Sequence, residues 1–118
     1  MTEPVLGSYY TFKYIGGCVY DPDKYNEEGM FVGRRGSKNI FATILPNREA
    51  TKQSIQSVML TYTDLGFQRI PHPSNKVIMT SETYYGLMDH LKSNRFKDPH
   101  DNGRVSPTLL ISADSLLS

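Results

Sequence analysis

Two β-prone runs separated by a short glycine-flanked loop constrain the fold of this chain more than any other feature. The runs are "MFV" at residues 30–32 and "NIFATIL" at 39–45, and the loop between them contains Gly33 and Gly36. Glycine readily adopts the positive φ that tight hairpin turns need, so the segment predicts a β-hairpin with its tip at residues 33–38. The fold should therefore contain an antiparallel strand pair in its first half.

The segment before this hairpin also has a β pattern. "YYTFKYI" at residues 9–15 alternates, which places Tyr10, Phe12 and Tyr14 on one face of a strand. The polar stretch "DPDKYNEEG" at 21–29 has the composition of a turn, because Asp-Pro favours turn initiation and the charges favour water. We therefore expect one strand, then a solvent-exposed turn, and then the hairpin.

Two later segments show helical spacing. In residues 48–65, Ile55, Val58, Met59 and Tyr62 recur at the helical period, with Asn47 as a candidate N-cap and Gly66 as a C-terminal glycine. A second helix is predicted from Thr80 or Ser81 onward. Its apolar stripe consists of Tyr84, Leu87, Met88 and Leu91.

Three short runs complete the set of predicted elements. They are the strand candidates "FQRI" at 67–70, "KVIMT" at 76–80 and "TLLIS" at 108–112. Together the elements predict a single α+β domain over residues 1–118, with a mixed, mostly antiparallel sheet of four to five strands and two helices packed on one face. We expect a flexible N-terminal arm at 1–8 and a mobile loop at 97–107.

Composition limits the kind of protein this can be. The 118 residues have a formal net charge of +1, which argues against nucleic-acid binding by bulk electrostatics. The single cysteine, Cys18, cannot form an intramolecular disulfide and fits a reducing, cytoplasmic compartment. No apolar run has the length of a membrane helix, and residues 1–4 do not resemble a signal peptide. We therefore expect no membrane association.

The hairpin tip is the first candidate site. Its sequence "GRRGSK" lacks the spacing of a phosphate-binding loop and is followed by a predicted strand, so helix N-terminal amides are missing. Two readings stay open: a solvated turn, or a basic finger in which Arg34, Arg35 and Lys38 grip phosphates or a carboxylate-rich partner.

The N-terminal aromatic residues also have two readings. Tyr9 beside Lys13 fits a stacking platform for single-stranded bases, which need aromatic faces and nearby cations. A strand that buries one aromatic face in a core has the same sequence pattern, and we favour core packing for this segment.

Catalytic patterns are sparse. His72 and His100, with Asp98 and Asp101, would have to converge in space to form a metal or hydrolase site, because no pair has ligand spacing on a regular element. The sequence therefore favours a non-catalytic protein without metal or cofactor, with a small hydrolase or metal-dependent enzyme as an alternative.

These observations predict an accessory or assembly module that binds another protein or a second copy of itself. Its contact surfaces would be the 33–38 hairpin and the 97–106 loop. Small chains of this kind suggest a viral or phage protein, or a subunit of a larger complex. The alternative is a nucleic-acid-binding domain that uses the basic hairpin and the N-terminal aromatic residues.

Overall fold

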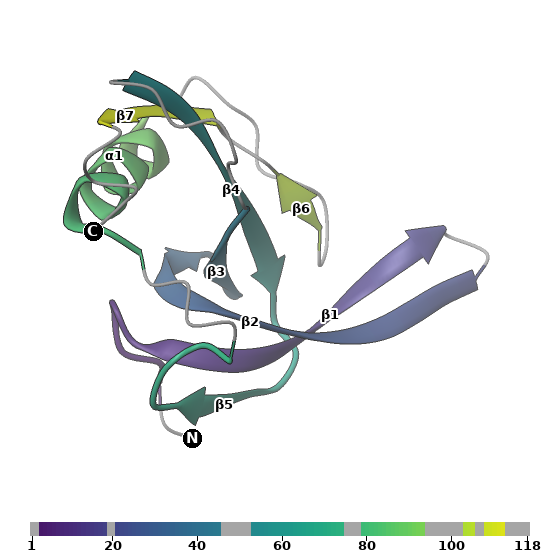
Figure 1. Cartoon of the computed structure of the whole chain (residues 1–118). Helices are drawn as coiled ribbons and strands as arrows, with labels where there is room; N and C mark the ends of the chain where they lie inside the picture. The colour runs from purple at the N-terminus through teal and green to yellow at the C-terminus, as the bar shows by residue number, and fades with distance from the viewer. Residues whose placement is uncertain are drawn as a thin grey trace.

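The computed structural model describes residues 3–18, 21–45, 53–74, 79–93, 103–105 and 108–112. Within these ranges the chain forms seven β-strands and one α-helix (Figure 1). In chain order they are β1 (Tyr9–Cys18), β2 (Asp21–Arg35), β3 (Lys38–Ile44), β4 (Gln53–Thr63), β5 (Phe67–Ile70), α1 (Ser81–Lys92), β6 (Arg104–Val105) and β7 (Thr108–Ser112). The predicted α+β arrangement of four to five strands with two helices on one face is wrong.

The strand order explains why more strands form than expected. Strands follow the order β5-β1-β2-β3-β4-β6, β7 also pairs with β4, and every one of these pairings is antiparallel. After β4, the chain turns at residues 64–66 and β5 pairs with β1 instead of with β4. The sheet therefore curls back on its first strand as a partly closed barrel.

The predicted helix over residues 48–65 accounts for most of the error. Its described part, residues 53–65, contains the strand β4 (Gln53–Thr63), which pairs with β3 over Val58–Thr63 and with β7 over Gln53–Ser57. Apolar side chains alternate along it and lie on one face, as a half-buried strand requires. These side chains are Val58, Leu60 and Tyr62. Long-range pairing outweighs the local helical spacing.

The predicted turn at residues 21–29 is also wrong, because this segment is the first part of β2 and pairs with β1 from Asp21 to Gly29. The two strands form an arm that projects from the body (Figure 1). Lys24, Tyr25 and Asn26 of β2 are exposed, which fits the polar sequence of this part of the strand. On the arm, the ring of Tyr25 lies over Gly16, where a Cβ atom would come within 2.9 Å of Tyr25 Cε2.

The second predicted helix is confirmed as α1. Thr80 caps it, since its side chain accepts a hydrogen bond from the Thr83 N–H at 3.3 Å. Leu87 is fully buried, and the rest of the predicted stripe is partly buried against the same cluster. The strands predicted at 67–70 and 108–112 are confirmed as β5 and β7. Of "KVIMT" at 76–80, residues 76–78 lie outside the described residues, and Met79 and Thr80 are not in a strand.

Two clusters lie on opposite faces of the curled sheet. The helix-face cluster is mainly aliphatic and is covered by α1; its buried members are Met30, Val32, Ile40, Ala42, Val58, Leu60, Tyr62, Met79 and Leu87. The aromatic-face cluster is enclosed by the curl of β1, β2, β3 and β5. Its buried members are Tyr10, Phe12, Tyr14, Phe31 and Phe41, with Phe67 partly buried. The predicted inward face of Tyr10, Phe12 and Tyr14 is confirmed.

Backbone hydrogen bonds hold part of the N-terminal segment on β2. The Gly7 N–H donates to the Phe31 carbonyl at 3.0 Å, and the Phe31 N–H donates to the Ser8 carbonyl at 2.9 Å. Most of the predicted mobile loop at 97–107 lies outside the described residues, but its Arg104–Val105 forms β6. The flexibility expected for these two segments stays a prediction.

Candidate binding pocket

The predicted hairpin is confirmed as β2–β3, with Arg35 opposite Lys38 and a two-residue turn at Gly36-Ser37. Gly36 has a φ of 58° and Gly33 a φ of 147°, both in the region that favours glycine. A register shift between Phe31 and Gly33 forms a bulge just before the turn. The two glycines therefore allow the backbone conformations of the bulge and the turn, as their positions in the sequence indicate.

The two arginines of this hairpin lie on opposite faces of the sheet. Arg34 pairs in register with Asn39, whereas Arg35 pairs with Lys38. Since Phe41 belongs to the aromatic-face cluster, strand alternation puts Asn39 and Arg34 on that face. Arg35 is on the helix face, so the two side chains cannot act as one finger.

Arg35 binds the C-terminal end of α1. Its Nη2 donates to the carbonyl of Leu91, one of the last carbonyls of the helix, which have no intrahelical partner. Burial and the nearby positive charge of Arg35 together lower the pKa of His90 from its ordinary value of 6.5, burial having the larger effect. The packing of Arg35 against the helix points to a structural role.

The other two cations of the tip are paired with carboxylates. Arg34 Nη1 lies 3.3 Å from Glu3 Oε1, with side chains 44% and 80% exposed. Lys38 Nζ lies 3.4 Å from Asp64 Oδ2. Exposed ion pairs of this kind are weak, about 0–1 kcal/mol each, so a ligand can exchange with them at small cost.

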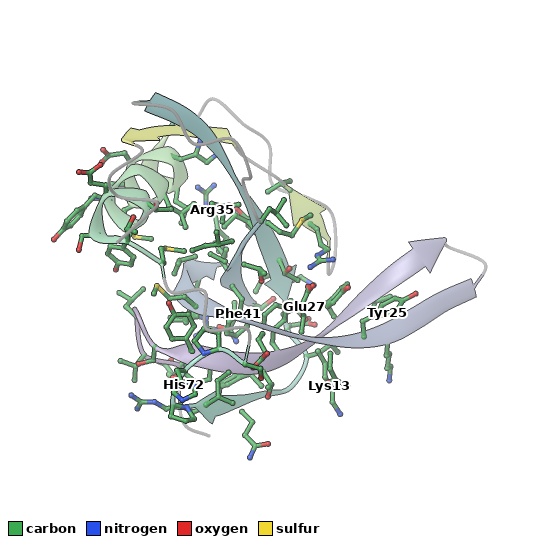
Figure 2. All side chains as sticks on the ribbon, in the orientation of Figure 1. Lys13, Tyr25, Glu27, Arg35, Phe41 and His72 are labelled. Atoms are coloured by element: carbon green, nitrogen blue, oxygen red, sulfur yellow. The ribbon has the colours of Figure 1, made fainter. Side chains whose placement is uncertain are left out.

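Tyr9 and Lys13 do not join the hairpin tip. The Tyr9 hydroxyl accepts a hydrogen bond from the Met79 N–H at 3.0 Å, and its ring packs against the helix-face cluster. Lys13 is exposed and lies opposite Asn26, far along β1 from the turn. Figure 2 shows Lys13 and Arg35 well apart on the ribbon. The five predicted binding residues therefore do not form one site.

One member of the predicted set, Arg34, lines a pocket of about 890 Å³ at the open end of the aromatic face. We call it the Asn39 pocket. Its apolar lining comes from Val5, Tyr10 and Phe67, among others. Its charged groups are Glu3, Arg34, Asp64 and Arg69, and its lining also includes the buried amide residue Asn39.

Asn39 is the unusual residue of this pocket. It is only 8% exposed, and its Oδ1 atom has no hydrogen-bond partner. Buried side-chain oxygens nearly always have a partner, so an unbonded one needs an explanation. The oxygen has essentially no accessible surface, so a ligand in the pocket does not reach it unless the side chain moves.

One wall of the pocket is an open strand edge. Within the described ranges β5 pairs with β1 alone, so its other edge carries no strand. The Lys13 N–H donates to the Gly66 carbonyl at 3.0 Å, which sets the alternation of the ladder. By that alternation, the backbone groups of Phe67 and Arg69 point away from β1. Both residues line the pocket.

At its other end the aromatic face is closed by Arg104. The guanidinium lies 4.3 Å from the centre of the Tyr14 ring and donates to Thr61 Oγ1 at 3.1 Å. It also forms an ion pair with Glu27. On the arm, Tyr25 stacks on Tyr14 with the ring centres 5.4 Å apart. The open end of the aromatic face is therefore the end at the Asn39 pocket.

Of the alternative catalytic site, the structure describes only His72. His72 is exposed, and its Nδ1 lies 3.4 Å from the Pro73 carbonyl oxygen (Figure 2). Asp98, His100 and Asp101 lie outside the described residues. Among the described part of the chain, no three His, Cys, Asp or Glu side chains are grouped to hold a metal ion.

Most pocket residues were missed from the sequence. One signal for Asn39 was present, because it shares a strand face with Phe41 and is thus a polar residue in an inward position. Asp64, Phe67 and Arg69 gave no local signal. They line the pocket because β5 returns to β1, a long-range contact.

Comparisons of the chain with models of protein families, with curated proteins and with solved structures found no match. No helix within the described residues has both the length and the apolar character needed to span a bilayer.

Proposed function

We propose that this chain is a non-catalytic accessory or assembly module that binds an extended segment of another protein in the Asn39 pocket. The observation that carries the proposal is the opening of about 890 Å³ lined by residues of β5 and of the β2–β3 hairpin, beside the edge of β5 that carries no strand within the described ranges. An extended peptide can pair with such a strand edge through its backbone.

The chemistry of the pocket supports recognition. Tyr10 and Phe67 supply aromatic surface, and charged side chains of both signs lie around them. The volume of the pocket falls in the range usual for binding pockets, about 300–1,000 Å³. Glu3 and Asp64 are each ion-paired, which suits a recognition surface better than acid–base chemistry.

Protein binding is favoured over nucleic-acid binding by the balance of charge. The pocket is lined by two arginines and two carboxylates, and Arg35 is engaged with α1. Nucleic-acid sites instead present a basic stripe that neutralises several phosphates. A cytoplasmic location, expected from the single cysteine, is part of this proposal.

The test begins with a random linear peptide library displayed on phage, selected against the intact chain. Enriched sequences are synthesised with a fluorophore, and their affinities are measured by fluorescence polarisation. A blocking variant, Gly66→Phe, adds bulk to the pocket lining, where a Cβ atom would meet nothing within 4 Å. Gly66→Ala is the matched control, and Tyr85→Ala controls for the distant, exposed surface of α1.

We expect dissociation constants on the order of 1–100 μM, as is usual for short peptides. Gly66→Phe should weaken binding at least about tenfold, whereas Gly66→Ala and Tyr85→Ala should not. Failure to enrich any peptide, or equal binding to all three variants, contradicts the proposal. Oligonucleotide binding at low salt that is lost in the double substitution Arg34→Ala, Arg35→Ala would favour nucleic acid instead.

A further inference from the structure

Resting on the proposed function, we infer that the segment bound in the Asn39 pocket is acidic, and that Glu3 of this chain competes with it for Arg34. Two features lead to this inference. One is a pair of arginines on the pocket face, of which only one is paired with a carboxylate. The other is the N-terminal strap, residues 3–6, which brings Glu3 to the paired arginine.

The two arginines of the pocket lie on the same face of the sheet. Side chains directly opposite each other on paired strands share a face. Arg69 lies opposite Tyr10, a member of the aromatic-face cluster, and Arg34 lies on that face through its pairing with Asn39. Both arginines line the pocket. Guanidinium groups bind carboxylates through strong, charge-assisted hydrogen bonds, so the opening has the chemistry of a carboxylate site.

The balance of charge in the lining depends on the N-terminal strap. Asp64 is paired with Lys38, which compensates its charge. Arg69 is exposed and, among the described residues, has no ion pair or side-chain hydrogen bond. Glu3 is the remaining carboxylate of the lining, and it belongs to the strap. Without Glu3 the lining keeps an excess of positive charge, which favours an acidic ligand.

The N-terminal strap is fixed at its base. It ends at Gly7, whose φ of 82° lies in the region that favours glycine. Along its length the Val5 N–H donates to the Tyr10 hydroxyl at 2.8 Å. Residues 3–5 line the pocket. The carboxylate of Glu3 is therefore presented to the opening by the chain itself, in the place where a carboxylate of a ligand would bind.

The far end of the strap is held weakly. The Glu3 side chain is 80% exposed, and its pair with Arg34 is of the exposed kind that contributes little to stability. Val5 and Leu6 are 51% and 57% exposed, so the strap buries little apolar surface. A peptide carboxylate can thus replace Glu3 on Arg34 while the body of the domain stays folded. Glu3 acts as an internal competitor of the ligand.

The internal competitor is tested with Glu3→Gln, which removes the charge and keeps the length of the side chain. Peptides enriched against the intact chain should bind this variant about two- to fivefold more tightly, as measured by fluorescence polarisation. Glu82→Gln is the matched control, because it makes the same change of net charge at an exposed position in the first turn of α1. An equal gain in both variants, or no gain in Glu3→Gln, contradicts competition.

The acidic character of the ligand is tested by a double-mutant cycle. Each Glu or Asp of the enriched peptide is replaced by Gln or Asn. At least one replacement should lose about fivefold or more in affinity on the natural chain and less than about twofold on Arg34→Gln or Arg69→Gln. A peptide with this replacement should no longer distinguish Glu3→Gln from the natural chain. Enrichment of peptides without acidic residues, or equal losses on all three proteins, would overturn the inference.

The outcomes separate the two proposals. If no peptide binds, or if Gly66→Phe has no effect, the proposed function fails. If peptides bind in the pocket but without the acidic requirement or the gain in Glu3→Gln, only the further inference fails. Tighter binding of an oligonucleotide, but not of the peptide, to Glu3→Gln would assign the positive charge to phosphate and also overturn the further inference.

Discussion

The two faces of the curled sheet are built differently. On the helix face, α1 covers an aliphatic cluster, and Leu87, which α1 contributes to that cluster, is 0% exposed. On the aromatic face no helix is packed within the described residues; the sheet encloses its own rings and is open at the Asn39 pocket. The difference indicates that one face is closed for stability while the other keeps an opening that a partner can fill.

Neighbouring arginines show the same difference at the scale of single residues. Arg35, on the helix face, bonds to the Leu91 carbonyl and finishes the C-terminal turn of α1. Arg34, on the aromatic face, has only an exposed pair with Glu3. Adjacent side chains of a strand point to opposite faces of the sheet. Arg35 therefore has a structural role, whereas Arg34 lies at the mouth of the pocket.

The largest expected effect is the loss of the helix-face packing. Leu87→Ala should lower the free energy of unfolding by about 2–5 kcal/mol, since it leaves a cavity at a fully buried position. Phe67→Ala, at a partly buried position beside the pocket, should cost about 1–3 kcal/mol. Urea denaturation measures both. A larger loss for Phe67 than for Leu87 would contradict the distinction between closed and open faces.

The next effect concerns the two ends of the aromatic face. Arg104→Met removes the ion pair with Glu27 and the hydrogen bond to Thr61, and should cost about 1–3 kcal/mol. Arg34→Met removes an exposed pair and should cost about 0–1 kcal/mol. Thermal unfolding followed by circular dichroism compares them. Equal shifts in melting temperature would mean that Arg104 does not close its end of the aromatic face.

The structure shows why the sequence misled most strongly at β4. Its residues Ile55, Val58, Met59 and Tyr62 fit a helical stripe, but Val58, Leu60 and Tyr62 fit a strand equally well. Such short apolar runs are ambiguous by periodicity alone. Pairing with β3 on one side and with β6 and β7 on the other decides the outcome, and β6 and β7 lie far from β4 in sequence.

Elements with local determinants were predictable. The β2–β3 hairpin depends on Gly36, and α1 depends on the Thr80 cap, so each is specified within a few residues. For the site, only Arg34 was anticipated. Phe67 and Arg69 reach the pocket through the return of β5 to β1, which no local pattern specifies.

The hairpin turn determines which arginine lies on which face of the sheet. The substitution Gly36→Ala tests how much the turn contributes to this register. At a φ of 58° an alanine is strained by about 1–2 kcal/mol, although a Cβ atom there would touch nothing within 4 Å. We expect a loss of about 1 kcal/mol in urea denaturation. Ser37→Ala is the control, with a change within about 0.5 kcal/mol, as is usual for surface positions. A neutral Gly36→Ala would show that the turn does not hold the register.

A stabilising substitution is expected at the pocket. Asn39→Leu replaces a buried oxygen that has no partner with an apolar group of similar shape, and should raise the free energy of unfolding by up to about 1 kcal/mol. Asn39→Asp, which buries a charge, should instead destabilise the chain at neutral pH. Chemical denaturation of both variants provides the comparison. A destabilised Asn39→Leu would show that the side chain of Asn39 stabilises the fold in spite of its unbonded oxygen.

The smallest effect is the pH response of the helix face. Burial first, and Arg35 second, lower the pKa of His90 below its ordinary value of 6.5. Below pH 6.5 the unfolded chain therefore binds more protons at His90 than the folded chain, so stability falls as the pH drops from 6.5 towards the folded pKa. NMR titration of the His90 ring should show that Arg35→Met raises its pKa while leaving it below 6.5, because burial, the larger cause, remains. If Arg34→Met raised the pKa of His90 as much, the two arginines would not be separated by the sheet as the register requires.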